Sequence, residues 1–286
     1  MKRSFSFVVF FATLAIGQTV AGAGLEMTIR AHPRRVIFGD PLYLEVTIVN
    51  RGEEVVTGPK PIPDLNTIGF PIYDPQTRLT INASSGGGGV GFPSDVSYQP
   101  GQAVKHYWHI YLPKLTQVDN KFWKPMRDGG GVVLYAQHGI APGLLLRSNL
   151  VNVGIGKRKK SEMLLLEHYA QNEVLGFEGG PSPANLGVSF KSPLNLKDTR
   201  TIGANLRAGE LQDMLFTMVS FQEVFEAAPA DQPERIRILV NNLKKQPDIK
   251  RQWLTQELHR LAKTFRMAAA TEALQKLIDE EAKQAE

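Results

Sequence analysis

The chain has 286 residues, of which 42% are hydrophobic, 21% charged and 8% aromatic, and none is cysteine. At roughly 150 residues per domain this length predicts two domains, and the hydrophobic content excludes a wholly disordered chain. The absence of cysteine excludes a disulfide framework, thiolate catalysis, a cysteine zinc site and an iron–sulfur cluster. Each domain must therefore be stabilised by the burial of its apolar side chains.

The first residues have the layout of an export signal. Lys2 and Arg3 form a short positive region, residues 5–16 are almost entirely apolar, and residues 21–23 are the small residues of a cleavage site. We expect cleavage after Ala23, which lowers the net charge from +5 to +3. The apolar run of 12 residues is short for a bilayer span, and a retained anchor is the alternative. The sequence thus predicts a periplasmic or extracellular protein with no stable membrane span after signal removal. It predicts no nucleic-acid partner, since such binders carry a clustered basic face.

Residues 25–156 show short alternating runs separated by Gly, Pro, Asn and Asp. The clearest run is 42–49, in which every second side chain is apolar and lies on one strand face: Leu42, Leu44, Val46 and Ile48. Further strands are predicted over 27–30, 36–38, 53–57, 68–73, 78–82, 103–112, 132–137 and 144–153. Seven or eight short strands in about 130 residues predict a β-sandwich.

Two local patterns carry a family resemblance. Residues 38–52 place Gly-Asp-Pro before an alternating strand and Asn-Arg-Gly after it, and a Gln-Pro-Gly-Gln turn at 99–102 precedes the strand of Trp108. This layout resembles the bacterial exported immunoglobulin-like domains over the first half of the mature chain. The resemblance implies an immunoglobulin-like sandwich of the disulfide-free kind, because the antibody-type cysteine pair is absent. Such modules serve in adhesion, protease inhibition, carbohydrate-enzyme accessories and plain spacing.

The C-terminal part has helical periodicity. Helices are predicted, in chain order, over 162–173, 211–225, 234–245, 248–265 and 270–278. Residues 231–234, Asp-Gln-Pro-Glu, have the form of a capping box that opens the third of these helices. Together they predict a small antiparallel helical bundle.

The fold class is therefore multidomain, all-β followed by all-α. The expected organisation is a signal peptide over 1–23, a sandwich over 24–156, a basic linker with a short helix and a Gly/Pro-rich connector over 157–210, and a helical domain over 211–286. The four consecutive cations at 157–160 predict a solvated linker with some interdomain freedom. Binding of an acidic polymer to these cations is the alternative, and an apolar face on either domain would instead close the junction. The connector at 176–203 either lies along the bundle or forms a binding loop.

The candidate binding surface is an aromatic strip on the strand over 103–112. Side chains alternate along a strand, so His106 faces the core while Tyr107, His109 and Tyr111 face outward, and the two histidines cannot chelate one ion. With Trp123 in the following loop, these outer residues are candidates to contact a peptide or a sugar. Ordinary structural roles for the histidines are the alternative.

No zinc-protease, hydrolase-elbow, serine–lysine, calcium-loop or phosphate-loop pattern is present, so no metal or cofactor is predicted. The interpretation is an exported, non-catalytic binding or scaffolding protein that contacts a protein or glycan of the cell envelope. One alternative is an inhibitor of an exported protease that acts through the loops at 64–71 or 113–128. The other is a hydrolase with an accessory sandwich, which would need Glu167, His168 and His259 to converge.

Overall fold

The computed structural model describes residues 24–61, 67–82, 94–112, 121–123, 126, 129–141, 143–164, 200 and 203–285. The predicted signal peptide, the glycine-rich stretch at 84–91 and nearly all of the connector at 176–203 lie outside these ranges.

The N-terminal part of the described chain consists of strands. They are β1 (Leu25–His32), β2 (Arg35–Ile37), β3 (Pro41–Asn50), β4 (Val56–Pro59), β5 (Ile68–Gly69), β6 (Pro71–Tyr73), β7 (Thr80–Asn82), β8 (Asp95–Tyr98), β9 (Ala103–Tyr111), β10 (Gly130–Leu134), β11 (Gln137–Ala141), β12 (Leu144–Arg147) and β13 (Val151–Gly156).

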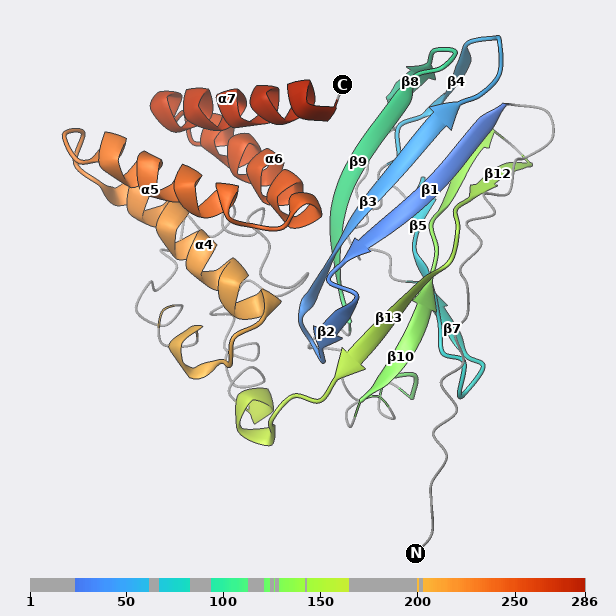
Figure 1. Cartoon of the computed structure of the whole chain (residues 1–286), viewed down its shortest axis with the longest axis horizontal. Coiled ribbons are helices and arrows are strands. Elements are labelled where there is room, and N and C mark those ends of the chain that lie inside the picture. Colours follow the sequence, from blue (N-terminus) through green and yellow to red (C-terminus); the bar gives the residue numbers. More distant parts are fainter. Residues whose placement is uncertain are drawn as a thin grey trace, which may run out of the picture.

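These strands form two main layers that face each other across one apolar core (Figure 1). One layer has the order β1-β3-β9, and the other has the order β2-β13-β10-β6-β7, with smaller sheets β12-β11-β5 and β4-β8. All pairings are antiparallel except that of β2 with β13. The described part of the chain is thus a β region followed by a helical region, as the sequence predicts at this level.

The alternation predicted for β3 is confirmed. Its inner face consists of side chains with no exposed surface: Leu42, Leu44, Val46 and Ile48. Asn50 ends the strand, where its side chain accepts a bond from the Gly52 N–H at 2.9 Å and donates to the Tyr98 carbonyl at 2.8 Å. The Asn-Arg-Gly signal therefore marks a real strand end, stabilised by a buried amide side chain.

Several strands differ from the prediction. The return strand β4 begins at Val56 instead of residue 53, and the strand β8 at Asp95 was not predicted. The predicted strands over 68–73, 132–137 and 144–153 are each split, into β5 with β6, β10 with β11 and β12 with β13. The register between β11 and β12 shifts at residues 139–141, and such an irregularity bends a sheet and interrupts the alternation from which strands are read.

At Ile29, the outer edge of β1 is occupied by a side chain instead of a strand. Asn149 accepts a hydrogen bond from the Ile29 N–H at 2.8 Å, and its amide nitrogen donates to the Ile29 carbonyl at 3.2 Å. The amide group of Asn149 thereby satisfies both backbone groups that a neighbouring strand would pair.

The C-terminal part contains four long helices: α4 (Glu210–Glu226), α5 (Gln232–Lys244), α6 (Asp248–Thr264) and α7 (Ala268–Ala285). Helical turns also occur at 160–164 and 203–205. The predicted helix over 162–173 is therefore described only at its beginning. No helix in the described ranges is long and apolar enough to cross a bilayer.

The predicted capping box is wrong. Asp231 precedes α5 but has helical backbone angles and makes no side-chain cap hydrogen bond. Glu234 pairs with Arg237 one turn later, at 2.7 Å, instead of reaching back to the start of the helix. Pro233 in the first turn lacks an N–H, so a helix start at this position leaves one fewer donor to satisfy.

The helical region packs against the outer face of the β1-β3-β9 sheet (Figure 1). Its apolar core includes two sheet residues, Tyr43 of β3 and Tyr111 of β9, together with the inward faces of all four helices. The two regions are therefore joined by a shared apolar core in this arrangement.

Candidate functional site

The predicted aromatic strip points outward from the sandwich, as alternation requires, but α6 covers it. His106 lies on the inner side, stacked on Trp108 at 5.4 Å, whereas His109 lies 4.4 Å from the ring of Trp253 on α6. Tyr111 is only 6% exposed. Tyr107 packs against the same helical core. The strip thus forms the interface between the sheet and the helices.

Tyr43 extends this strip and was not predicted. It pairs directly with His109 across the β3–β9 ladder, and its ring lies 5.5 Å from Trp253. Burial raises the pKa of Tyr43 well above its ordinary value, and the nearby carboxylate of Glu210 adds to the shift. The Tyr43 hydroxyl therefore stays protonated, and the interface encloses it. The missed signal was its register position opposite an outward aromatic residue.

Trp123, the predicted anchor in the following loop, lies inside the sandwich. It is 1% exposed and meets Phe122 edge-to-face at 4.7 Å, within the same core as Met126. The placement corrects the expectation of a surface anchor, because an indole buried this far has no face left for a partner.

A buried lysine lies within the interface between the sheet and the helices. Lys250 of α6 is 1% exposed, and its Nζ lies 2.7 Å from Glu210 Oε2 and 3.2 Å from Asp213 Oδ2, both on the first turn of α4. The same ammonium lies 5.7 Å from the centre of the Tyr43 ring, within the range of a cation–π contact. Lys250 thus links α6 to α4 by ion pairs and to the sheet by its contact with Tyr43.

A second buried charge cluster joins the sandwich to the chain that leaves it. Arg158 is 4% exposed; its Nε donates to the Phe38 carbonyl at 2.7 Å, and its guanidinium contacts Asp40 and Glu162. Asp40 Oδ2 in turn accepts the Glu210 N–H at 3.1 Å, at the start of α4. The prediction that all four cations of 157–160 are solvated is therefore wrong for Arg158, because two carboxylates pair with it.

The protonation of Asp40 is balanced between opposing effects. Burial raises the pKa of this carboxyl to about 6, and Arg158 opposes the shift by its charge and its hydrogen bond. A group with that pKa titrates in mildly acidic conditions, so the charge holding Arg158 in place depends on pH.

Two further histidines lie on the inner side of the sandwich, one partly buried and one fully buried. Burial lowers the pKa of His106 to about 4, with smaller contributions from Lys60 and His138. His138 is fully buried, and its Nδ1 lies 2.5 Å from the Thr67 carbonyl. Both rings are held neutral, which supports the structural alternative for His106.

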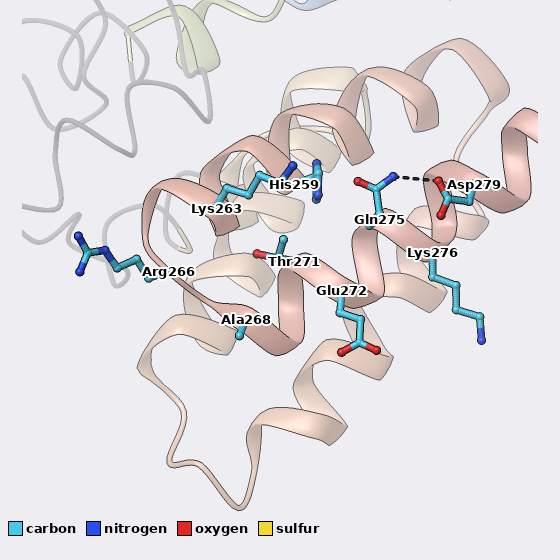
Figure 2. A pocket seen from close by; sticks show the side chains of 9 residues that line it. All are labelled: His259, Lys263, Arg266, Ala268, Thr271, Glu272, Gln275, Lys276 and Asp279. Atoms are coloured by element: carbon cyan, nitrogen blue, oxygen red, sulfur yellow. Dashed lines mark hydrogen bonds between the residues drawn. The ribbon is translucent and has the colours of Figure 1, made fainter.

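The helical region has an open groove of about 850 Å³ between α6 and α7 (Figure 2). Its lining consists of His259, Lys263, Arg266, Ala268, Thr271, Glu272, Gln275, Lys276 and Asp279. Figure 2 shows the side chains of Lys263 and His259 running toward each other from α6, facing Thr271 and Gln275 on α7, while Arg266 and Lys276 extend away. Polar side chains from both helices thus line this groove.

The groove carries charges of both signs, with Lys263, Arg266 and Lys276 alongside Glu272 and Asp279. Among the described residues, Lys263, Arg266 and Lys276 form no ion pair with any acidic group. His259 is 9% exposed, and its Nε2 has no hydrogen-bond partner in the described part of the chain. Burial lowers the pKa of His259, Lys263 adds to the shift, and Asp279 opposes it.

The remaining predicted sites lie partly outside the described ranges. Glu167 and His168 are outside, as are residues 64–66 of the first candidate loop and most of 113–128. The described remainder of the first loop runs through β5 and into the first residue of β6. Within the described ranges, no group of three or more His, Asp or Glu side chains is placed to hold a metal ion. The sheet–helix junction is filled by Tyr43, Trp253 and Met214 rather than hollowed into a polar cleft.

Comparisons with known proteins identify no family. No protein-family model matches the chain, and no curated protein matches it. Among solved structures, the sporulation control protein Spo0M from Bacillus subtilis aligns at 11% identity and a TM-score of 0.31, over 53% of this chain and 56% of that one. A β-glucosidase from Erythrobacter marinus aligns at 15% identity and 0.29, over 46% of this chain and 15% of that one. The C-terminal domain of Wzt aligns at 11% and 0.29, over 50% and 77%.

The chain thus covers less than two thirds of Spo0M and of the glucosidase. Scores of this size carry no argument about fold family or function.

Proposed function

We propose that this protein is an exported, non-catalytic binding or scaffolding protein of the cell envelope or extracellular space, built as one rigid unit. The observation that carries the proposal is the shared core. Trp253 and Tyr43 close the junction, and the strongly paired charges there, Lys250 and Arg158, serve to join elements. A scaffold needs such a rigid junction, whereas a catalytic cleft between the domains would need it open.

We also propose that the β region is a disulfide-free immunoglobulin-like sandwich. The strand order supports this assignment if β1, β3 and β9 are strands A, B and E, and if β13, β10 and β6 are strands G, F and C. The chain passes from one layer to the other between β1, which pairs with β3, and β2, which pairs with β13. This change of sheet agrees with a first strand whose two segments belong to different layers.

Export is tested by the N-terminus of the native protein. The chain is isolated from the source organism's envelope and culture fluid, and its intact mass is measured. We expect a mature chain that begins at Gly24. A cytosolic chain that retains Met1 would refute the exported role.

Binding is tested with a photoreactive amino acid placed at exposed positions in the full exported chain. Leu145 on β12 and Lys276 on the groove are two such positions, and the exposed Lys245 at the end of α5 is the matched control. A discrete crosslinked partner from Leu145 or Lys276, absent from Lys245, supports a binding role. Turnover of an envelope substrate by the purified chain, with no such partner, would favour the hydrolase alternative.

A further inference from the structure

The two edges of the β1-β3-β9 sheet differ in how their backbone groups are used. At one edge, the N–H and the carbonyl of Ile29 both bond to the side chain of Asn149. The other edge is β9, which pairs with β3 and with no further strand of the described chain (Figure 1). The direction of the β9 backbone groups therefore decides whether this second edge is open.

The register of the sheet fixes which residues of β9 direct their backbone groups outward. In an antiparallel pair, two opposite residues either bond to each other or both point away. Ile29 points away from β3, so its partner Val46 points toward β9 and bonds with His106. The bond from the Asn50 N–H to the Gln102 carbonyl, at 3.2 Å, follows the same alternation. The odd-numbered residues of β9 therefore direct their N–H and carbonyl groups away from β3.

Three of these odd-numbered residues lie on an accessible part of the strand. Ala103 and Lys105 are exposed, Tyr107 is half-buried, and within the described ranges no hydrogen bond engages their outward N–H or carbonyl groups. Helix α6 covers the other end of β9, where His109 lies 4.4 Å from Trp253. Residues 103–107 thus form an open edge, long enough to pair with a strand of about five residues.

Both faces of the open edge offer side chains to an added strand. On the side of the sandwich core, Val104 and Trp108 are only partly buried and pack against that core. Burial, followed by the charge of Lys60, lowers the pKa of His106 to about 4, so Lys60 lies near this same side of β9. On the opposite face, Lys105 is exposed and forms no ion pair with a described residue. The open edge therefore combines unfilled apolar surface with two lysines.

The nearby carboxylates do not neutralise these lysines. Glu45 of β3 and Asp248 of α6 both act on Tyr107. Each already has an arginine partner: Glu45 pairs with Arg30 at 3.0 Å, and Asp248 pairs with Arg251 at 3.2 Å. The open edge is therefore positively charged, and pairing it with the same edge of a second copy would bring like charges together.

We propose that the open edge of β9 binds an extended, acidic segment of a partner protein as an added strand. The proposal rests on the binding role proposed above and specifies where the partner binds and what it presents. The outward backbone groups of residues 103, 105 and 107 would pair with the backbone of that segment. A carboxylate opposite Lys105 would lie beside its ammonium, and apolar side chains at the alternate positions would cover Val104 and Trp108. A lysine at a sheet edge discourages pairing with another lysine-bearing edge, but it attracts an acidic strand.

The test measures the hydrogen exchange of single backbone amides by NMR in the chain over residues 24–286. In the free protein, we expect the Lys105 and Tyr107 amides to exchange faster than the His106 amide, which bonds to β3. The probe is a peptide of about ten residues, enriched against this chain from a displayed random library. We expect the enriched peptides to alternate acidic with apolar residues. They should slow the Lys105 and Tyr107 amides at least about tenfold and leave the Ile29 amide unchanged.

Two variants at one position separate the charge from the backbone pairing. Lys105→Ala removes the ammonium, keeps the N–H, and should weaken peptide binding by at most about fivefold, as for an exposed ion pair. Lys105→Pro also removes the outward N–H, which an edge strand tolerates, and should weaken binding about fivefold further. Lys245→Ala, at the exposed end of α5, is the control and should change affinity by less than about twofold.

Three outcomes would overturn the proposal. The first is equally slow exchange of the Lys105, Tyr107 and His106 amides in the free chain, which would mean that the edge is already covered. The second is a library that yields no binding peptide, or only peptides without acidic residues. The third is slowing that appears without peptide as the protein concentration rises, which would identify a second copy as the occupant. Because exchange is measured in the unsubstituted chain, it remains decisive even if Lys105→Pro fails to fold.

The same measurement distinguishes failure of this proposal from failure of the proposed function. A discrete crosslinked partner at Leu145 or Lys276, without the exchange changes, would keep the binding role and reject this edge. A cytosolic chain that retains Met1 would reject the exported role and leave the exchange result standing.

Discussion

Replacing Arg158 with alanine tests whether a buried charge cluster stabilises the junction. The substitution removes the 2.7 Å bond from Nε to the Phe38 carbonyl and the guanidinium contacts with Asp40 and Glu162. Asp40, which is 2% exposed, would then be a buried carboxylate without a cation, and the buried Glu162 would keep only Arg207, whose Nε lies 3.9 Å from its Oε2. Breaking a buried pair from one side costs about 3–5 kcal/mol of folding free energy, and we expect a loss of that size.

The loss should depend on pH in a defined direction. Burial raises the pKa of Asp40 to about 6 while Arg158 holds it down, so Arg158→Ala raises this pKa further. Protonation removes the unpaired charge that makes the variant unstable. The difference in unfolding free energy between the two proteins should therefore be smaller at about pH 5 than at about pH 8.

The assay is urea unfolding of residues 24–286, followed by circular dichroism and tryptophan fluorescence. Trp253 reports the sheet–helix interface, and Trp108 and Trp123 report the sandwich. Arg34→Ala, at an exposed position before β2, is the control and should change stability by less than about 0.5 kcal/mol. A loss below about 1 kcal/mol for Arg158→Ala, with an unchanged denaturant slope, would refute the reasoning.

Three other changes have predictable outcomes. Trp253→Ala removes the rings' contacts with Tyr43 and His109 and should cost about 3–5 kcal/mol in urea unfolding; a cost under about 1 kcal/mol would mean that the helices dock elsewhere in solution. Lys250→Met keeps an apolar stem but loses the ammonium, and should cost only about 1–3 kcal/mol because its carboxylate partners keep some solvent exposure; a gain in thermal stability would contradict this. The neutral ring of His106, with its pKa lowered to about 4, should make the unfolding free energy fall as the pH drops from about 6.5 to 4, by at most about 3 kcal/mol; His106→Gln should remove that part of the slope, and an unchanged slope would exclude this ring as its source.

The periodicity of the sequence predicted most of the strands and helices, but it did not predict which of them pack against each other. The inner face of β3 and the opposite orientations of His106 and His109 follow from the two-residue period of a strand. The same period shows that Tyr111 points outward, but a surface and an interface have the same pattern along one strand. The covering helix lies more than a hundred residues later, and nothing local specifies that contact.

The sequence indicates the buried charge clusters around Lys250 and Arg158 to different degrees. Lys250 shares a helix face with Trp253 and Leu254, at spacings of three and four, and a lysine in such an apolar stripe indicates a buried pair. Arg158 lies within a run of cations whose pattern indicates solvent. Only its three-dimensional position beside Asp40, 118 residues earlier, distinguishes it from its neighbours. His259, predicted only as part of a catalytic group with Glu167 and His168, lines the groove between α6 and α7.

The amide of Asn149 has a consequence for how copies of this protein meet. A sheet edge with free backbone groups can be extended by a strand from another molecule, and this pairing can lead to aggregation. At Ile29 both groups are already occupied, by bonds of 2.8 and 3.2 Å, so an incoming strand would first have to displace a side chain that is held at two points. At this position, therefore, the edge of β1 is protected against extension by a strand from another copy of the protein.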